Sequence, residues 1–291
     1  MNIVRAAPAA VAFAVAVSAW SLTGCEFKSG SNSGADASSA SAATVAQSDD
    51  AGVAIKAAIA NSARLADDRA QDEWRKPAAV LGFLQVKPGM RVLDVFAGGG
   101  YYTELLSYVV GDGAVLAYNN KAYTNYAAKE LEAHFAGGRL PNVKRIEVEA
   151  GDLKLVPGEL DAAIFIRSYH DVYWHPKEGW APVDGARLLK EVFSGLKPGG
   201  VVVVQDHVAN AGGDPGEVVG NLHRIDPAVL KRDFLAAGFV LDAESDAFRN
   251  PADDHTVLVF DPKVRHHTDD VLLRFRKPLP AASENASGTP E

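Results

Sequence analysis

Residues 92–107, "VLDVFAGGGYYTELLS", decide the fold of this chain. Apolar residues and Asp94 lead into three consecutive glycines, Gly98, Gly99 and Gly100, and the next ten residues have the composition of a helix. Glycine permits positive φ and lets a ligand approach the backbone, and the first turn of a helix offers free N–H groups. The stretch therefore predicts a strand, a tight turn and a helix over 101–110. The turn either holds a nucleotide-like ligand or is only a compact connection.

Strands and helices alternate along the rest of the chain. The predicted strands lie near 91–96, 114–119, 144–150, 161–168, 201–206, 239–246 and 270–276. The predicted helices lie over 52–75, 101–110, 122–135, 185–196 and 227–238. This alternation indicates a Rossmann-like α/β fold with a seven-stranded, mainly parallel sheet and helices on both faces. A ligand of such a sheet binds beyond the carboxyl ends of the strands, where the three glycines fall.

Composition sets limits on the core and on the partners. The chain has 291 residues, 47% of them hydrophobic and 23% charged, so it is able to bury a sizeable core. Its formal charge of −8 disfavours nucleic acid and anionic lipid as electrostatic partners. The single cysteine, Cys25, excludes a disulfide within the chain and a cysteine-based zinc site.

The N-terminal segment predicts export. Residues 1–5 end in Arg5, and residues 6–24 carry no charge and are rich in Ala and Val, which is typical of a signal peptide over residues 1–24. A membrane anchor is the alternative, but the segment is weakly apolar and no charged stop-transfer cluster follows it.

"SLTGC" at residues 21–25 resembles the lipobox of bacterial lipoproteins. The resemblance implies that Cys25 is lipidated and becomes the first mature residue. A Ser-, Ala- and Gly-rich tether then spans 25–50, a globular domain spans 51–278 and a disordered tail spans 279–291. We expect a membrane lipoprotein that faces the periplasm, and Glu26 after the cysteine favours the outer membrane.

"VLDVFAGGG" resembles motif I of class I S-adenosylmethionine-dependent methyltransferases. Asp94 matches the acidic position, and Gly98 and Gly100 match the second and third glycines, whereas Phe96 replaces the first. The resemblance continues in order through "AVLAYNN", "AGDL", "ELDAAIFIRSYHDVYW" and "LLKEVFSGLKPGGVVVVQDH", over roughly residues 75–277. "RAQDEWRKP", "GGGYYT", "LHRID" and "FRNPADDHT" look like a bacterial subgroup of predicted methyltransferases.

The resemblance implies S-adenosylmethionine as cofactor. Asn119 falls where the family places an acidic residue toward the ribose, Asp152 where a side chain meets the adenine amino group, and Leu153 against a ring face. The full set of implied cofactor-binding residues is Asp94, Phe96, Gly98, Gly99, Gly100, Tyr102, Asn119, Asp152, Leu153 and Ser168. A dinucleotide-binding Rossmann domain is the alternative, but its glycine signature and acidic ribose partner are incomplete here.

The candidate catalytic residues are His170 and Asp171. His170 follows the fourth strand, where the transferable methyl should point, and a neutral imidazole there could take a proton from an oxygen or nitrogen acceptor. Asp171 could orient the ring. The alternative is that His170 only bonds backbone groups. Tyr169, Asp206, His207 and Arg224 are candidates for holding the acceptor, and for Arg224 a structural ion pair is the alternative.

Two further clusters have less specific signals. Arg69, Asp72 and Arg75 recur at three-residue spacing and are expected on one helical face, which is either solvated or a lid over the cofactor. The group Asp253, Asp254, His255, His266 and His267 lacks the spacing of an HExxH-like motif, so no metal is expected.

Together these features predict a methyltransferase that acts on a small or envelope-associated molecule and binds no nucleic acid and no metal. Two alternatives stay open. One is a catalytically inactive binding protein that kept the fold, which Phe96 and Asn119 would favour. The other is a nicotinamide- or flavin-dependent oxidoreductase.

Overall fold

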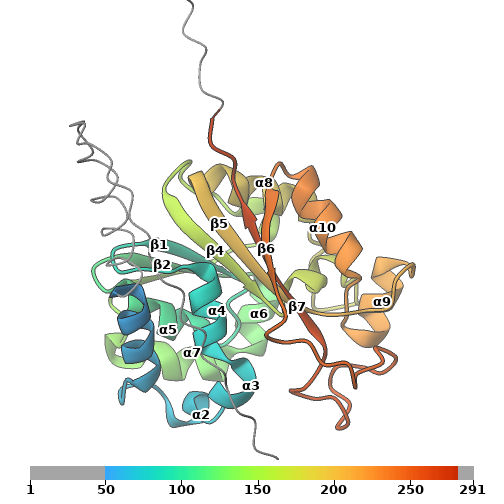
Figure 1. The fold of residues 1–291 in the computed structure, drawn as a ribbon, viewed down its shortest axis with the longest axis horizontal. Helices are drawn as coiled ribbons and strands as arrows, with labels where there is room; N and C mark the ends of the chain where they lie inside the picture. The colour runs from blue at the N-terminus through green and yellow to red at the C-terminus, as the bar shows by residue number, and fades with distance from the viewer. Residues whose placement is uncertain (1–49, 281–291) are drawn as a thin grey trace, which may run out of the picture. The chain divides into compact units, whose positions relative to one another are not determined.

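The computed structural model describes residues 50–280, and these residues form a seven-stranded sheet with the strand order β3-β2-β1-β4-β5-β7-β6 (Figure 1). The strands are β1 (Arg91–Val95), β2 (Ala114–Asn119), β3 (Val143–Glu147), β4 (Leu160–Ile166), β5 (Leu196–His207), β6 (Val240–Ser245) and β7 (Asp270–Arg276). The first five strands are parallel, and β7 runs antiparallel to both β5 and β6. The predicted fold class is therefore confirmed.

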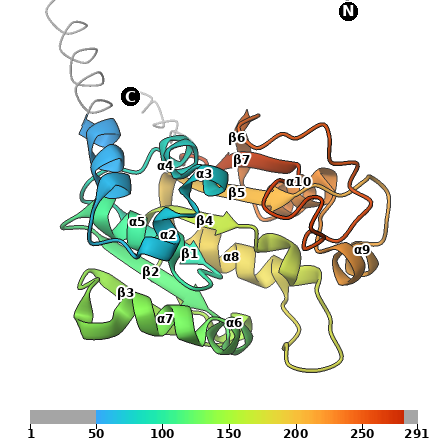
Figure 2. The same cartoon turned by 90° about the horizontal axis from the view of Figure 1, so that it is seen from below.

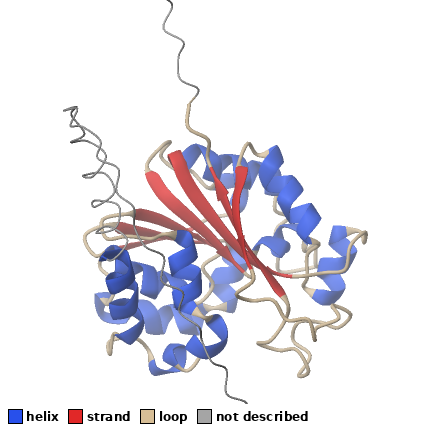
Figure 3. Ribbon diagram, in the orientation of Figure 1, coloured by secondary structure: helices blue, strands red, loops and turns tan. Residues whose placement is uncertain are grey.

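Helices cover both faces of the sheet (Figures 2 and 3). They are a helix over residues 50–60, α2 (Ala66–Arg69), α3 (Asp72–Arg75), α4 (Pro77–Leu84), α5 (Tyr101–Val110), α6 (Lys121–Tyr126), α7 (Ala128–Phe135), α8 (Gly185–Gly195), α9 (Pro215–Leu222) and α10 (Pro227–Ala236). Three short 3₁₀ turns are η1 (Ala136–Gly138), η2 (Ala150–Asp152) and η3 (Tyr169–Tyr173). None of the helices among residues 50–280 is long and apolar enough to cross a membrane.

Two apolar layers hold the helices on the sheet. Successive residues of a strand point to opposite faces, so a buried strand contributes to both layers. Leu93 and Val95 pack in one layer with α8 and α10, whereas Val92 packs in the other layer with α4 and α5. This double burial explains why the central strands are continuously apolar.

The predicted helix over 52–75 is wrong beyond residue 60. Asn61 Oδ1 accepts a hydrogen bond from the backbone N–H of Ala63 at 2.9 Å, and this local turn competes with the helix. The chain then forms α2 and α3, which are separate single turns.

The shared helical face predicted for Arg69, Asp72 and Arg75 therefore does not form. Asp72 instead accepts two hydrogen bonds from the buried Arg64, each 2.7 Å long. The guanidinium of Arg75 lies over the ring of Trp74, 4.5 Å from its centroid.

The sequence prediction missed helix α9. Its start carries the same signal that marks α10: an aspartate side chain accepts a bond from the first turn, and proline is the first helical residue. Asp214 and Pro215 play these parts in α9, and Asp226 and Pro227 in α10. The predicted signal peptide, Cys25, and almost all of the tether and tail lie outside the described residues.

Candidate functional site

The site lies where the order of the strands reverses. The chain runs outward from β1 to β3 and returns to β4 on the other side of β1, so a switch point falls between β1 and β4. The glycine turn follows β1, and η3 follows β4. Ser168 Oγ donates a hydrogen bond to the carbonyl oxygen of Val95 at 3.3 Å, which ties the start of η3 to the end of β1.

The three glycines of the turn have different surroundings. Gly98 has φ +57°, and a Cβ added to it would meet no atom within 4 Å. A Cβ on Gly99 would lie only 2.7 Å from Cβ of Glu130, and one on Gly100 only 3.3 Å from the ring of His134. Both of these neighbours belong to α7. Gly99 and Gly100 therefore permit close packing of α7, whereas at Gly98 the space is open and ligand binding stays a prediction.

Asn119 braces this turn. Its Oδ1 accepts from the backbone N–H of Gly98 at 3.0 Å, and its Nδ2 donates to the carbonyl oxygen of Gly98 at 2.9 Å. The ribose contact expected for Asn119 stays a prediction. Sequence reasoning missed its neighbour Asn120, whose Oδ1 caps α6 and whose buried Nδ2 has no hydrogen-bond partner among the described residues. This free donor lies at the carboxyl end of β2.

Phe96 adopts the backbone conformation that favours glycine, with φ +53°. Phe96 replaces the first glycine of motif I, and the structure shows that its backbone keeps the conformation that glycine would adopt there. The ring of Phe96 stacks on Tyr123 with the centroids 5.1 Å apart. Rings then follow one another from Tyr123 to Trp180, Trp174 and His223 at centroid distances of 5.2–5.3 Å. This aromatic row links the glycine turn to the histidines described below.

Asp94 lies beneath the turn and is 3% exposed. Its Oδ2 accepts a hydrogen bond from Thr103 Oγ at 2.7 Å, which fixes the first turn of α5 against β1. Burial raises the pKa of Asp94 to about 7, although Thr103 and the charge of Arg75 oppose the shift. Tyr102 donates to the carbonyl oxygen of Arg75 at 2.7 Å, so it too holds the scaffold of the turn.

We expect Asp94→Asn to flatten the dependence of stability on pH. The folded chain binds a proton at Asp94 that the unfolded chain has lost, so the parent's free energy of unfolding falls as pH rises from about 4 to 7. Between pH 5 and 8 the parent should lose on the order of 2–3 kcal/mol relative to the variant. Thermal unfolding of both proteins across this range measures the difference. Parallel curves would show that Asp94 ionises normally in the folded chain.

His170 lies at the carboxyl ends of β4 and β5 and is 4% exposed. Its Nδ1 donates to Asp206 Oδ1 at 2.7 Å, and its backbone N–H donates to the other oxygen of Asp206 at 2.8 Å. Burial lowers the pKa of His170, but the charges of Asp206 and Asp171 outweigh burial and raise it to about 9. In the absence of a bound cation, the ring of His170 therefore carries a proton at pH 7. The sequence prediction that His170 acts as a base needs the neutral ring instead.

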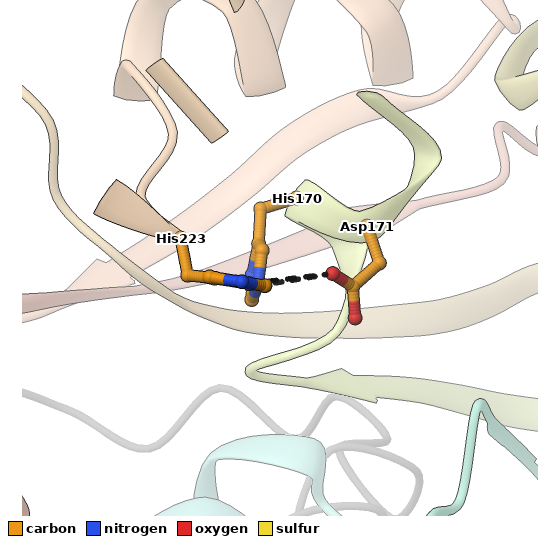
Figure 4. Close-up of side chains that lie close together, drawn as sticks. All are labelled: His170, Asp171 and His223. Atoms are coloured by element: carbon orange, nitrogen blue, oxygen red, sulfur yellow. Dashed lines mark ion pairs between the residues drawn. The ribbon is translucent and has the colours of Figure 1, made fainter. Parts of the chain in front are cut away.

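Asp171 makes contacts on two sides. Tyr123 donates to its Oδ2 at 2.5 Å. Its Oδ1 is buried without a hydrogen-bond partner among the described residues, 3.3 Å from Nε2 of His170 and 3.8 Å from Nδ1 of His223 (Figure 4). Sequence reasoning missed His223 and Tyr123, since nothing in their spacing shows that the fold brings them to Asp171.

The other candidates for acceptor binding are tied to the scaffold. Nδ1 of His207 lies 2.8 Å from Thr268 Oγ and 2.9 Å from Asp270 Oδ1. Tyr169 is 1% exposed and donates to Asp233 at 2.9 Å.

Arg224 is fully buried, and its role is structural. It forms a two-point ion pair with Asp253 at 2.9 and 3.0 Å and donates to the carbonyl oxygens of Val208 and Val257. The structure therefore supports the ion-pair alternative, and the substrate role expected for Arg224 is withdrawn.

His255 and His266, in the cluster at residues 253–267, contact different partners. Nε2 of His255 lies 3.0 Å from Asp269, and the ring of His266 lies tilted against Trp74 with the centroids 4.3 Å apart. Within residues 50–280, two other groups bring three metal-ligating side chains together. They are His170, Asp171 and His223, and Asp68, Glu104 and His134.

Comparisons with known proteins agree with this architecture. The family model for protein-L-isoaspartate(D-aspartate) O-methyltransferase matches residues 68–152, the segment that contains the glycine turn and Asn119. No curated protein matches the chain by sequence.

Several solved structures superpose on most of the chain. A protein described as a methyltransferase, solved with the Trm112 methyltransferase activator of Haloferax volcanii, has a TM-score of 0.50 at 16% identity, over 73% of this chain and 94% of that one. An S-adenosylmethionine-dependent methyltransferase from Aquifex aeolicus gives 0.48 at 19% identity, over 71% and 98%. The [4+2]-cyclase SpnF gives 0.49 at 21% identity, over 76% and 86%. The strand order of the sheet and the superposition with a TM-score of 0.50 show that the chain has a Rossmann-like α/β methyltransferase fold.

Proposed function

We propose that the chain is an S-adenosylmethionine-dependent methyltransferase that acts on a small or envelope-associated acceptor. One observation carries the proposal: two features lie at the same switch point of the sheet. The first is the glycine turn, where Gly98 has open space beside it, and the second is the buried pair His170 and Asp171. The first feature suits a cofactor that lies against backbone, and the second suits an acceptor with a dissociable proton. The shared fold and the match of residues 68–152 support the same conclusion.

The residues at the turn fit S-adenosylmethionine. Gly98 leaves space for the methionine portion, and the unpartnered Nδ2 of Asn120 is a donor for the ribose hydroxyls. Asp152 is exposed, so its carboxylate is free to meet the adenine amino group, whereas Leu153 is 1% exposed and packs in the core beside it. When bound, the cofactor supplies a methyl group on a sulfonium, whose transfer is an in-line displacement that depends on alignment.

The chain's own residues would bind and orient the acceptor. Asp206 is a positioning residue, because it fixes the ring and the backbone of His170. The free Oδ1 of Asp171 offers an acceptor for the substrate's proton, and Tyr123 holds the other oxygen in place. The aromatic row from Phe96 to His223 lines the same region and would keep water from it.

An inactive binding protein with this fold is the second candidate, because Phe96 and the engaged Asn119 both depart from the family pattern. An oxidoreductase is the third. Calorimetric titration with S-adenosylmethionine, its demethylated product and NAD separates them. Binding of the first two and a turnover assay on candidate acceptors would support the methyltransferase, whereas binding of NAD alone would exclude it.

We expect Gly98→Asn to weaken binding of S-adenosylmethionine about tenfold or more, a loss of at least ~1.4 kcal/mol. Asparagine tolerates positive φ better than other residues, so the side chain fills the open space without breaking the turn. Gly137→Asn is a matched control: Gly137 in η1 has φ +64° and ψ +14°, a conformation that asparagine tolerates, and its surroundings are equally open. Equal affinity of both variants would make the turn purely structural.

The N-terminal segment adds a proposal about location. We propose that lipidated Cys25 anchors the protein to a membrane that faces the periplasm, on the sequence signal alone. We expect Cys25→Ser to release the protein from membranes or to leave its precursor uncleaved, as fractionation and mass spectrometry would show. Unchanged membrane association with normal processing would rule out lipid attachment.

A further inference from the structure

We propose that His170, Asp171 and His223 form a binding site for one divalent transition-metal ion. His170 and Asp171 belong to η3, and His223 ends α9. Segments far apart in sequence thus bring two imidazoles and one carboxylate to the same point (Figure 4). The proposal differs from the sequence expectation of no metal, which considered only the separate cluster at residues 253–267.

The distances suit an ion that lies between the three side chains. An ion with bonds of about 2.0–2.2 Å in tetrahedral geometry holds its ligands roughly 3.3–3.6 Å apart. Asp171 Oδ1 lies 3.3 Å from Nε2 of His170 and 3.8 Å from Nδ1 of His223. The one ligand atom offered by each residue lies within 4.8 Å of the others, so a small rotation of the half-buried His223 closes the set.

The atoms that face one another are the ones left free. Asp171 is 8% exposed, and its Oδ1 has no hydrogen-bond partner among the described residues, while Tyr123 satisfies Oδ2. Nδ1 of His170 is bonded to Asp206, which leaves Nε2 to face Oδ1. A carboxylate that holds the far nitrogen of a histidine is the usual support of a metal ligand, because it fixes the tautomer and the ring.

The charges at the site favour a cation. In the part of the chain that the structure describes, Asp171 and Asp206 form ion pairs with histidines alone. The second three-residue cluster provides a contrast, because Arg139 reaches Glu104 at 2.6 Å and supplies a positive charge there. Two buried carboxylates without Arg or Lys partners are costly unless a cation compensates them. In the metal-free site the protonated ring of His170 supplies this charge, and a bound metal ion would supply it instead.

The donors indicate the kind of ion. Two imidazoles and one carboxylate suit zinc, iron, cobalt or nickel rather than magnesium or calcium, which prefer oxygen ligands. Three protein ligands leave at least one coordination position open, as in catalytic sites. A hydroxyl or thiol bound there would lose its proton to water more readily, and Oδ1 of Asp171 would then serve as a ligand instead of as the proton acceptor proposed above. The proposed metal binding depends only on the geometry of the three side chains. The proposed activation of a bound hydroxyl or thiol rests in addition on the proposed methyl transfer.

The test is a titration of the full-length, chelator-treated chain with Co²⁺ and with Zn²⁺. Calorimetry gives the stoichiometry and affinity, and the visible absorption of Co²⁺ reports its ligands. We expect one ion per chain. Loss of an outer-shell partner of a metal site costs 10–100-fold in affinity, so Asp171→Asn and His223→Asn should each weaken binding by about 100-fold or more.

His255→Asn is the matched control. His255 has φ +63° against +49° for His223, it is half-buried as well, and it also lies beside a carboxylate. Its replacement should leave affinity unchanged. Metal should also raise the melting temperature of the parent and of the control, but not that of the site variants.

Absence of binding to the parent would overturn the proposal, as would equal weakening in the control or undiminished binding by Asp171→Asn. A parallel titration with S-adenosylmethionine keeps the two proposals apart. Cofactor binding without metal binding would remove only the metal site, and metal binding without cofactor binding would remove only the methyltransferase function.

Discussion

Arg224→Met is expected to lower the free energy of unfolding by about 3–5 kcal/mol. Arg224 and Asp253 are both fully buried at their side chains and share two hydrogen bonds. Removing the guanidinium leaves the Asp253 carboxylate buried without its partner, which is costlier than losing the attraction between the two. The melting temperature should fall by about 6–20 °C.

Lys231→Met serves as the control, because Lys231 and Glu244 form an exposed ion pair. Such pairs contribute about 0–1 kcal/mol, so this variant should unfold near the parent. Thermal unfolding of both variants decides the matter. A nearly normal melting temperature for Arg224→Met would make the ion pair dispensable and would reopen a role for Arg224 in substrate binding.

The ion pair also explains how the long polar segment before β7 is held against the sheet. Arg224 joins Val208, at the end of β5, to Asp253 and Val257 in that segment. Asp253 Oδ2 in turn accepts from the backbone N–H of Asp269. The segment is therefore fastened to the carboxyl edge of the sheet, next to the helix end that presents His223.

Local signals in the sequence predicted the central elements well. The predicted helix over 101–110 and the predicted strands over 114–119 and 270–276 agree with α5, β2 and β7 residue by residue. Periodicity and turn chemistry suffice there because each element buries apolar residues, and because α5 and β2 end at Gly111 and Asn119. The helix over 52–75 failed where the side chain of Asn61 bonds the nearby backbone.

The candidate site was harder to predict, because its contacts join distant parts of the chain. His170 and Asp171 were identified from their position after β4. The partners that decide their chemistry are Asp206, Tyr123 and His223, which come from three other elements. The roles of Gly99 and Asn119 likewise depend on what packs against the turn, and a spacing pattern carries no such information.

His170→Ala is expected to lower turnover by a factor of about 10²–10⁴ once an acceptor is known. Nε2 of His170 faces Oδ1 of Asp171 at 3.3 Å, so the imidazole orients the carboxylate that is proposed to take the acceptor's proton, and it is also a proposed metal ligand. Affinity for S-adenosylmethionine should stay within a few-fold of the parent, because the proposed cofactor contacts come from Gly98, Asn120 and Asp152 instead. Turnover and KM test the predicted loss of activity, and calorimetry on the same preparation tests the predicted affinity for S-adenosylmethionine.

A second variant separates chemistry from architecture at this position. In His170→Gln the amide can still donate to Asp206, so the buried carboxylate keeps a partner, but no imidazole is present. We expect its melting temperature to recover toward that of the parent while turnover stays as low as in His170→Ala. Recovery of turnover together with stability would show that His170 only positions its neighbours. Loss of cofactor affinity in both variants would place His170 in the scaffold of the cofactor site, and the acceptor would then have to bind elsewhere along the carboxyl edge.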